Sequence, residues 1–356
     1  MAHQRRTSRE IKVGSTSIGG HSPITVQSMT NSDPHDFEAT LRQTSELFMA
    51  GCDIVRISAP DLESATLFKF IRERGITSPL VADVHFDYRI AVAAAEAGVD
   101  KLRINPGNIG SRAKVREVVE ACKANGTAIR IGVNSGSLEK DILLKHGSPT
   151  AEALAESALR HLEMLEEENF YNTVLSVKSS DTETMIRANR ILAEKTDYPL
   201  HLGVTEAGGG RRALIKSSVG IGSLLTDGIG DTVRISLTDD PVREVEAARE
   251  LLSVLGLSRT PEMDIISCPT CGRTKIDLIP LVAEFERVAK AEGLYNKSIK
   301  VAIMGCAVNG PGEAREADIG VAGGVGEALL FKRGEILRKI KEKDIISELI
   351  REIRLM

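Results

Sequence analysis

The chain has 356 residues, which is enough for about two domains of ordinary size. Acidic residues outnumber basic ones by 50 to 46, which argues against a protein that binds nucleic acid or membrane surfaces in general. The aromatic content is only 3%, without Trp, which argues against aromatic side chains that stack on bases or sugars. No segment approaches the ~18 consecutive apolar residues of a transmembrane helix.

From residue 24 to about residue 255, short apolar strands alternate with amphipathic helices. The predicted strands are 24–29, 53–58, 80–85, 101–105, 128–133, 173–178, 200–206 and 231–236, and the helices between them include 37–49, 112–124, 151–168 and 242–255. Eight such units in this length are typical of a (β/α)₈ barrel, whereas a doubly wound open sheet, the alternative, rarely has so many regular parallel units. Residues 11–20 predict a small hairpin that caps the barrel.

A second region follows a break in this periodicity. It is predicted to contain a strand, a helix over 277–292, a strand over 299–304, a Gly-rich loop and a charged C-terminal helix that includes 332–354. The fold class predicted for the chain is therefore α/β, with a TIM barrel followed by a smaller α+β domain. The predicted boundaries are a barrel over 1–255, a linker over 256–267 and a second domain over 268–356.

Basic residues recur near the carboxyl ends of the predicted strands. The segments are VRIS (55–58), LRIN (102–105), IRIG (129–132) and VRIS (233–236), and a fifth strand ends in Val177-Lys178. Because strand side chains alternate, the basic residues face the lumen if the flanking aliphatic residues face the helices. The barrel mouth, where active sites of such barrels lie, is therefore predicted to hold five cations: Arg56, Arg103, Arg130, Lys178 and Arg234.

Five cations at one mouth repel one another unless anions compensate them, and Arg suits phosphate. Asp83 and Glu206 are the obvious partners if these cations form only internal ion pairs, but two acids leave a surplus of positive charge. The Gly-rich turns at 105–110 and 206–212 favour an anion site as well. Asp83 and His85, on one face of the third predicted strand, are expected to belong to the substrate site with these cations. They and Glu206 either handle protons or only orient the Arg side chains, and a barrel metal is the weaker interpretation.

Three cysteines lie in the second region, as Cys268 and Cys271 in a CxxC motif and Cys306 in GCAVNGPGE. Three thiols suit a zinc ion or an iron–sulfur cluster. No His follows His201, so a structural zinc site would need a carboxylate as its fourth ligand. A redox disulfide leaves Cys306 unexplained, whereas a cubane cluster with three thiolates and one labile ligand uses all three thiols.

Cys52 and Cys122 fall on apolar patterns and are predicted to be core residues. Five cysteines without a recognisable signal peptide indicate a reducing compartment, so we expect a cytoplasmic protein.

Motifs along the whole chain resemble those of the 4-hydroxy-3-methylbut-2-enyl diphosphate synthase (IspG or GcpE) family. The matching segments are QSMTN (27–31), VRIS (55–58), ADVHFD (82–87), RINPGNIG (103–110), RIGVNSGSL (130–138), VTEAG (204–208), CPTCGR (268–273) and MGCAVNGPGEA (304–314). The resemblance implies a TIM barrel with a separate cluster domain. It also implies reductive ring opening and dehydroxylation of 2-C-methyl-D-erythritol 2,4-cyclodiphosphate, through two one-electron transfers, in isoprenoid biosynthesis.

The resemblance also implies residue roles. Cys268, Cys271, Cys306 and Glu313 would ligate a [4Fe-4S] cluster, and the carboxylate would exchange more readily than a thiolate. Glu206 and Asn309 would assist proton delivery. The diphosphate would be bound at Arg56, Arg103, Arg130, Lys178, Arg234 and Ser236, with Asn134 and Thr205 as neighbouring contacts.

The implied partners are a small cyclodiphosphate substrate and either flavodoxin or ferredoxin as the electron donor. A homodimer with active sites shared between chains is expected, because the barrel mouth and the cluster lie in separate domains joined by a short connector. Two other functions stay open from the residues alone: a redox-neutral phosphate-binding barrel, such as an aldolase or pterin-type synthase, with a structural zinc module, and a non-catalytic iron–sulfur electron carrier.

Overall fold

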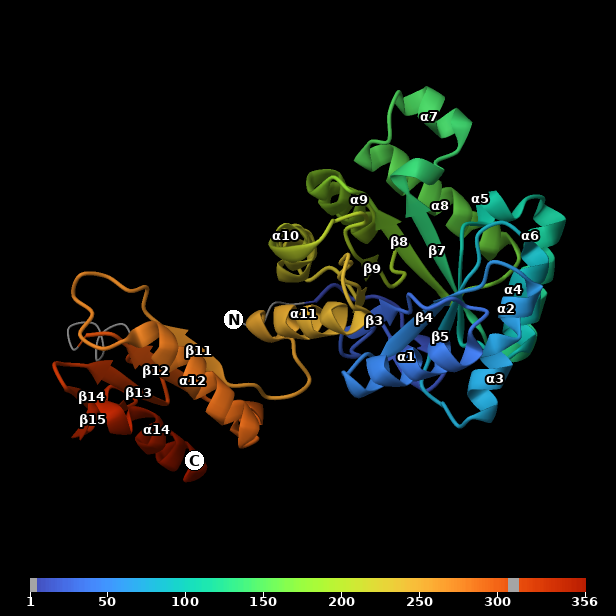
Figure 1. Ribbon diagram of the computed structural model, residues 1–356. Helices are drawn as coiled ribbons and strands as arrows, with labels where there is room; N and C mark the ends of the chain where they lie inside the picture. The colour runs from blue at the N-terminus through green and yellow to red at the C-terminus, as the bar shows by residue number, and fades with distance from the viewer. Residues whose placement is uncertain (1–4, 307–313) are drawn as a thin grey trace. The chain divides into compact units, whose positions relative to one another are not determined.

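The computed structural model describes residues 5–306 and 314–356, and the chain divides into two compact units, 1–257 and 258–356 (Figure 1). This division falls inside the predicted linker. In the part of the chain that is described, no helix is both long and apolar enough to cross a membrane.

The first unit is built on an eight-stranded parallel sheet with the strand order β8-β7-β6-β5-β4-β3-β10-β9. An isolated bridge between Leu175 and Leu200 joins its two ends. This arrangement confirms the predicted TIM barrel. The strands are β3 (Thr25–Met29), β4 (Ile54–Ser58), β5 (Leu80–Asp83), β6 (Lys101–Ile104), β7 (Ala128–Asn134), β8 (Thr173–Lys178), β9 (His201–Leu202) and β10 (Thr232–Val233).

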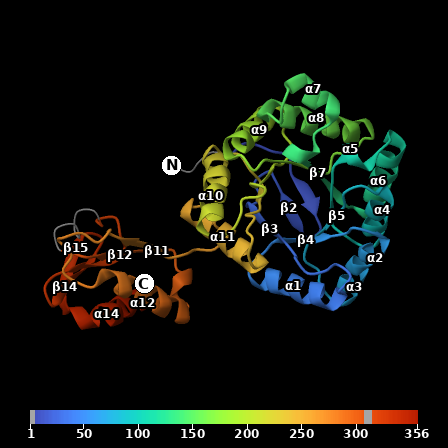
Figure 2. The same ribbon diagram turned by 45° about the horizontal axis from the view of Figure 1, so that its top comes forward.

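Helices surround this barrel as a ring (Figure 2). They begin where side chains cap free backbone N–H groups, as Asp36, Asp181 and Asp240 do by accepting hydrogen bonds from the first turn of α1, α9 and α11. The elements are α1 (Phe37–Met49), α2 (Leu62–Ala65), α3 (Leu67–Glu73), α4 (Tyr88–Glu96), α5 (Pro106–Ile109), α6 (Arg112–Asn125), η1 (Ser135–Ser137), α7 (Lys140–His146), α8 (Ala151–Glu167), α9 (Thr182–Lys195), α10 (Gly210–Thr226) and α11 (Pro241–Val254).

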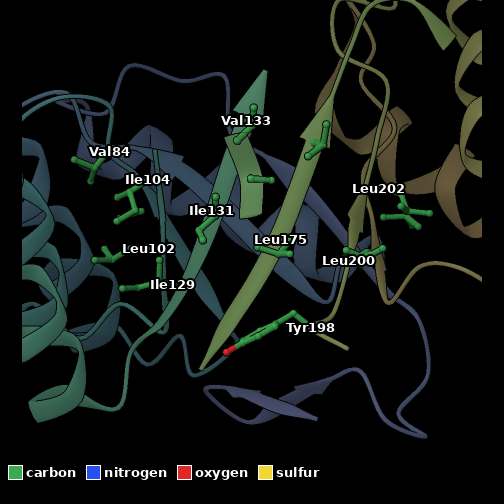
Figure 3. Close-up of a cluster of buried hydrophobic side chains, with 14 of the residues drawn as sticks. Val84, Leu102, Ile104, Ile129, Ile131, Val133, Leu175, Tyr198, Leu200 and Leu202 are labelled. Carbon is green, nitrogen blue, oxygen red and sulfur yellow. The ribbon is translucent and has the colours of Figure 1, made fainter. Parts of the chain in front are cut away.

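The main hydrophobic core lies between the strands and these helices. Leu102, Ile104, Ile129 and Ile131 are fully buried there (Figure 3). They alternate along β6 and β7 with the residues that point into the barrel. The packing of the aliphatic side chains outward therefore directs the basic side chains inward.

A small hairpin of β1 (Ile11–Val13) and β2 (Thr16–Ile18) confirms the sequence prediction. Its apolar side chains form one buried cluster with residues from the beginnings of the barrel strands. The cluster, which we call the floor plug, consists of Ile11, Val13, Ile18, Ile54, Val81, Ala128 and Val174. The floor plug lies at the end of the barrel opposite the mouth.

The second unit has a five-stranded sheet, β11-β12-β13-β14-β15, in which the first three strands are parallel and the last two antiparallel. Two long helices accompany it, and their apolar residues form its core with the sheet. The elements are β11 (Asp264–Ser267), α12 (Leu278–Ala291), η2 (Leu294–Asn296), β12 (Lys300–Met304), β13 (Ile319–Gly323), β14 (Glu327–Lys332), β15 (Glu335–Lys341), η3 (Glu342–Asp344) and α14 (Ile345–Arg354).

Two sequence predictions fail in this unit. Residues 264–267 belong to β11 and not to a linker, and a helix over 332–354 is wrong because β15 precedes α14. Arg333 and Gly334 have φ values of 49° and 82°, which the tight turn between β14 and β15 requires. Ile336 and Ile340 suggested a helix because residues four apart share one face in a strand as well as in a helix.

Candidate active site

A cavity of about 230 Å³ lies at the carboxyl end of the barrel strands. It is lined by Arg56, Asp83, His85, Arg103, Arg130, Gly132, Asn134, Ser176, Lys178, Thr205, Arg234 and Ser236. The structure thus brings together all ten residues that sequence reasoning placed in a substrate site. Gly132 and Ser176 were missed, although each has the same inward parity as Arg130 and Lys178 on its own strand.

Two carboxylates compensate part of the positive charge at this mouth. Asp83 lies 3.4 Å from a terminal nitrogen of Arg103 and 3.8 Å from Nε of Arg56. Glu244 of α11 lies 3.1 Å from Nε of Arg234. The remaining cations, Arg130 and Lys178, have no ion pair among the described residues, so the pocket has a surplus of positive charge suited to an anionic ligand.

The sequence predicted Glu206 as the second carboxylate that pairs with the mouth cations, but the structure places Glu244 in this role. It is buried and also accepts hydrogen bonds from Ser28 Oγ at 2.8 Å and from the Leu237 backbone N–H at 3.0 Å. Glu206 is exposed, with φ at 52° in the left-handed region that non-glycine residues rarely adopt. An acidic residue on the core-facing stripe of α11 was the available signal for Glu244.

Met29, at the end of β3, is a second residue that sequence reasoning missed. Its Sδ accepts hydrogen bonds from Nε and a terminal nitrogen of Arg56 at 3.0 and 2.9 Å, and a terminal nitrogen of Arg234 lies 3.8 Å away. The thioether therefore orients two guanidinium groups without neutralising either of them.

Burial perturbs the titration of the mouth. Desolvation lowers the pKa of Arg56 to about 10, and desolvation together with neighbouring cations holds the pKa of Arg130 and of Lys178 well below their usual values. Burial alone would raise the pKa of Asp83, but the charge of Arg56 and a hydrogen bond with His85 outweigh it and lower that pKa. Asp83 is thus held ionised, while Arg130 and Lys178 have no carboxylate partner among the described residues.

Two Gly-rich turns flank the mouth as predicted, since α5 begins at Pro106 and α10 at Gly210. Asn105 Oδ1 accepts a hydrogen bond from the Gly107 N–H at 3.1 Å and fixes the first turn. Gly208 and Gly210 adopt φ values of 93° and 59°, which only glycine reaches without strain.

The three cysteines of the second unit lie in loops that follow two neighbouring strands of its sheet. Cys268 follows β11 and Cys306 follows β12, and these strands are parallel neighbours. The Gly305 N–H donates a hydrogen bond to Cys268 Sγ at 3.3 Å, while the Cys271 N–H donates to Thr274 Oγ1 at 3.1 Å. The two loops that carry the thiols are thus held together.

All three thiols are free, and an N–H donor already points at one sulfur, as suits a cluster thiolate. In this part of the described chain the three do not form a closed metal-binding group. Asn309 and Glu313, also assigned to this region from the sequence, lie outside the described residues. The donor set fits an iron–sulfur cluster that is completed by a further ligand.

Cys52 and Cys122 are buried, and burial raises the pKa of each thiol to about 12. Cys271, in contrast, is exposed. We therefore expect iodoacetamide at pH 8 to label Cys271 in cluster-free folded protein and to spare Cys52 and Cys122, because the thiolate is the reacting form. Peptide mass spectrometry measures this. Equal labelling of all three before denaturation would contradict it, and denatured protein provides the positive control.

The comparisons with known proteins agree with these features. Residues 8–249 match the family model of the GcpE TIM-barrel domain, and residues 264–355 match that of the GcpE protein C-terminal domain. The 4-hydroxy-3-methylbut-2-en-1-yl diphosphate synthase (flavodoxin) of Clostridium perfringens is 55% identical over 98% of this chain and 99% of its own. The protein of the same name from Caldanaerobacter subterraneus is 52% identical over 100% and 99%.

Among solved structures, the dihydropteroate synthase of Stenotrophomonas maltophilia is similar with a TM-score of 0.50 and 16% identity, over 70% of this chain and 98% of its own. That likeness shows the barrel fold alone. Both parts of the chain match the family, and the full-length relatives share more than half of their residues with it, so the chain belongs to the GcpE family.

Proposed function

We propose that this chain reduces 2-C-methyl-D-erythritol 2,4-cyclodiphosphate to 4-hydroxy-3-methylbut-2-enyl diphosphate in the methylerythritol phosphate pathway. The reaction opens the ring, takes up two electrons with protons, and releases one hydroxyl as water. The observation that carries the proposal is the cavity lined by five cations, with only two carboxylates paired to them among the described residues. A cyclic diphosphate supplies the missing negative charge.

The mouth residues divide the work of binding. The diphosphate is held by Arg56, Arg103, Arg130, Lys178, Arg234 and Ser236. Asn134 and Thr205 contact the rest of the substrate, and Asp83 pairs with Arg56 and Arg103 and orients them beside it. His85, 3.2 Å from Arg103, orients that guanidinium from the rim.

Cys268, Cys271, Cys306 and Glu313 hold a [4Fe-4S] cluster in this proposal. Such a cluster supplies single electrons and a Lewis-acidic iron when bound. Glu206 and Asn309 assist the delivery of protons to the substrate, with the carboxyl group of Glu206 as the group that titrates. The exposed position of Glu206 supports this role, because a proton donor needs exchange with solvent.

The electron donor is flavodoxin, as the names of the relatives indicate for those proteins. We place the enzyme in the cytoplasm, where free thiols persist. A redox-neutral barrel with a structural zinc site would need a fourth Cys or His, and the sequence has none near Cys306. A simple electron carrier would not account for five cations at the barrel mouth.

The active enzyme is a homodimer in which the cluster of one chain serves the barrel of the other. In a barrel of this kind helices run antiparallel to the strands, so α11 ends on the side opposite the mouth. The connector between α11 and β11 covers residues 255–263. Fully extended, it spans at most roughly 30 Å, so a second copy supplies a cluster to the mouth more readily than its own chain.

The test is anaerobic purification followed by assay with chemically reduced flavodoxin. Brown protein that converts the cyclodiphosphate to the linear diphosphate, followed by ³¹P NMR, is the expected result. A colourless protein with stoichiometric zinc and no conversion would overturn the proposal.

A further inference from the structure

Lys101 is a charged residue at the barrel floor to which no role has been assigned. It is the first residue of β6, has no solvent exposure, and has the same inward parity as Arg103. Its register neighbours on the two adjoining strands are Val81 and Ala128, both members of the floor plug. The lysine therefore lies at the floor of the barrel with apolar neighbours on both adjoining strands, two residues before Arg103 of the mouth.

Among the described residues, Lys101 Nζ has neither a hydrogen-bond partner nor an ion pair. The adjacent Asp100 has the opposite parity, and its carboxylate accepts hydrogen bonds from Arg72 and from the Leu80 N–H. A buried ammonium group without an acceptor is strongly disfavoured, whereas a buried neutral amine is tolerated.

The strands around Lys101 contribute mostly positive charge to the lumen. The charged or titratable inward groups are Arg56 of β4, Asp83 of β5, Arg103 of β6 itself, Arg130 of β7, Lys178 of β8, His201 of β9 and Arg234 after β10, while β3 contributes the neutral Gln27 and Met29. Burial, and then the charges of Arg130 and Arg56, hold the pKa of Lys101 well below its usual value, with Asp100 opposing them weakly. Burial, and then the charges of Arg130 and Lys178, lower the pKa of His201 too.

We propose that the amine of Lys101 is neutral in the empty barrel and takes up a proton when the anionic substrate enters the pocket above it, so that substrate binding and proton uptake are coupled. This inference rests on the proposed function, because the dianion of the cyclodiphosphate is the charge that stabilises the new ammonium group. Lys101 is thus a positioning residue whose charge adjusts to the occupancy of the mouth.

The coupling has a definite sign. The protonated form binds the anion more tightly, so raising the pH above the pKa of the free-state amine weakens binding, by up to about tenfold per pH unit until the pKa of the bound state is passed. Each phosphate of the cyclic substrate has one strongly acidic group, so the ligand itself takes up no proton near neutral pH.

The test is calorimetric titration of the anaerobic holoenzyme with cyclodiphosphate, without reductant, near pH 8 in buffers of different ionisation enthalpy. For the wild type we expect uptake of about one proton per substrate bound. Lys101→Met is expected to abolish most of that uptake and to flatten the pH dependence of Kd. His201→Gln is the matched control, because it removes the other buried base of the floor and should leave the uptake unchanged.

Equal proton uptake by wild type and Lys101→Met, or its loss in His201→Gln instead, would overturn the inference while leaving the proposed function intact. Absence of binding heat in the wild type would count against the proposed function and, with it, against this inference. Lys101→Gln provides a second variant should the Met variant fail to fold. In Lys101→Met the melting temperature of the substrate-free protein should rise or stay level, because an unpartnered buried amine is replaced by an apolar side chain.

Discussion

Arg130→Leu is expected to weaken cyclodiphosphate binding while stabilising the empty protein. Arg130 is 1% exposed, and its Nε and one terminal nitrogen have no hydrogen-bond partner among the described residues. The loss of one or more charge-assisted hydrogen bonds should raise Kd by about tenfold to a hundredfold. In the empty protein the same change removes an uncompensated buried cation, so the melting temperature should increase.

Calorimetric titration and thermal unfolding measure these opposite effects, and iron content confirms that the cluster is intact. Arg116→Leu is the matched control, since Arg116 is exposed on α6 and pairs with Glu168 at 3.0 Å. It should change neither quantity appreciably. Unaltered Kd in the Arg130 variant would place the anion site elsewhere, and a lowered melting temperature would contradict the view that the empty mouth is electrostatically strained.

Mixing two inactive variants should restore activity if sites are shared between chains. Arg103→Leu loses a guanidinium that contacts Asp83 and His85 in the mouth, whereas Cys306→Ser loses a proposed cluster ligand of the second unit. In a mixed dimer one barrel and the cluster facing it are both normal. After statistical exchange of subunits, about a quarter of wild-type activity should return, because half of the dimers are mixed and half of their sites are intact.

Differently tagged chains that copurify establish that exchange has occurred. The control mixes Arg103→Leu with Arg130→Leu, which places both lesions in barrels, so mixing should add no activity beyond that of the two variants assayed separately. If each chain uses its own cluster, every site in the first mixture keeps one lesion, so an inactive mixture with confirmed exchange would refute shared sites.

The barrel and the direction of its mouth cations followed from local rules of the sequence. Arg103 lies between Leu102 and Ile104, and Arg130 lies between Ile129 and Ile131. When the aliphatic side chains pack against the helices, the alternation of side chains along each strand directs the guanidinium groups into the barrel. Lys101 obeys the same rule, two residues before Arg103, and its inward position could have been inferred in the same way.

The predictions from the sequence were wrong where the same apolar spacing fits both a helix and a strand. The spacing of Ile336 and Ile340 fits a helix or a strand, and the turn at Arg333 and Gly334 decides for the hairpin. The segment 264–267 contains two isoleucines but is too short for its sequence to distinguish a strand from a connector. Its pairing with β12 shows that it is a strand.

By itself, therefore, the sequence determined the strand–helix alternation, the inward parity of the basic residues and the three clustered thiols, because each depends on neighbours within a few positions. Only the tertiary structure decided which partners those residues have. Glu244 reaches Arg234 because α11 packs against β3. Among the residues that the structure describes, Lys101 has no acceptor, and the apolar cluster of the β1–β2 hairpin includes its register neighbours Val81 and Ala128. These arrangements depend on packing between segments far apart in the chain, such as α11 against β3, and the free energy of a buried charge depends on all of its surroundings at once.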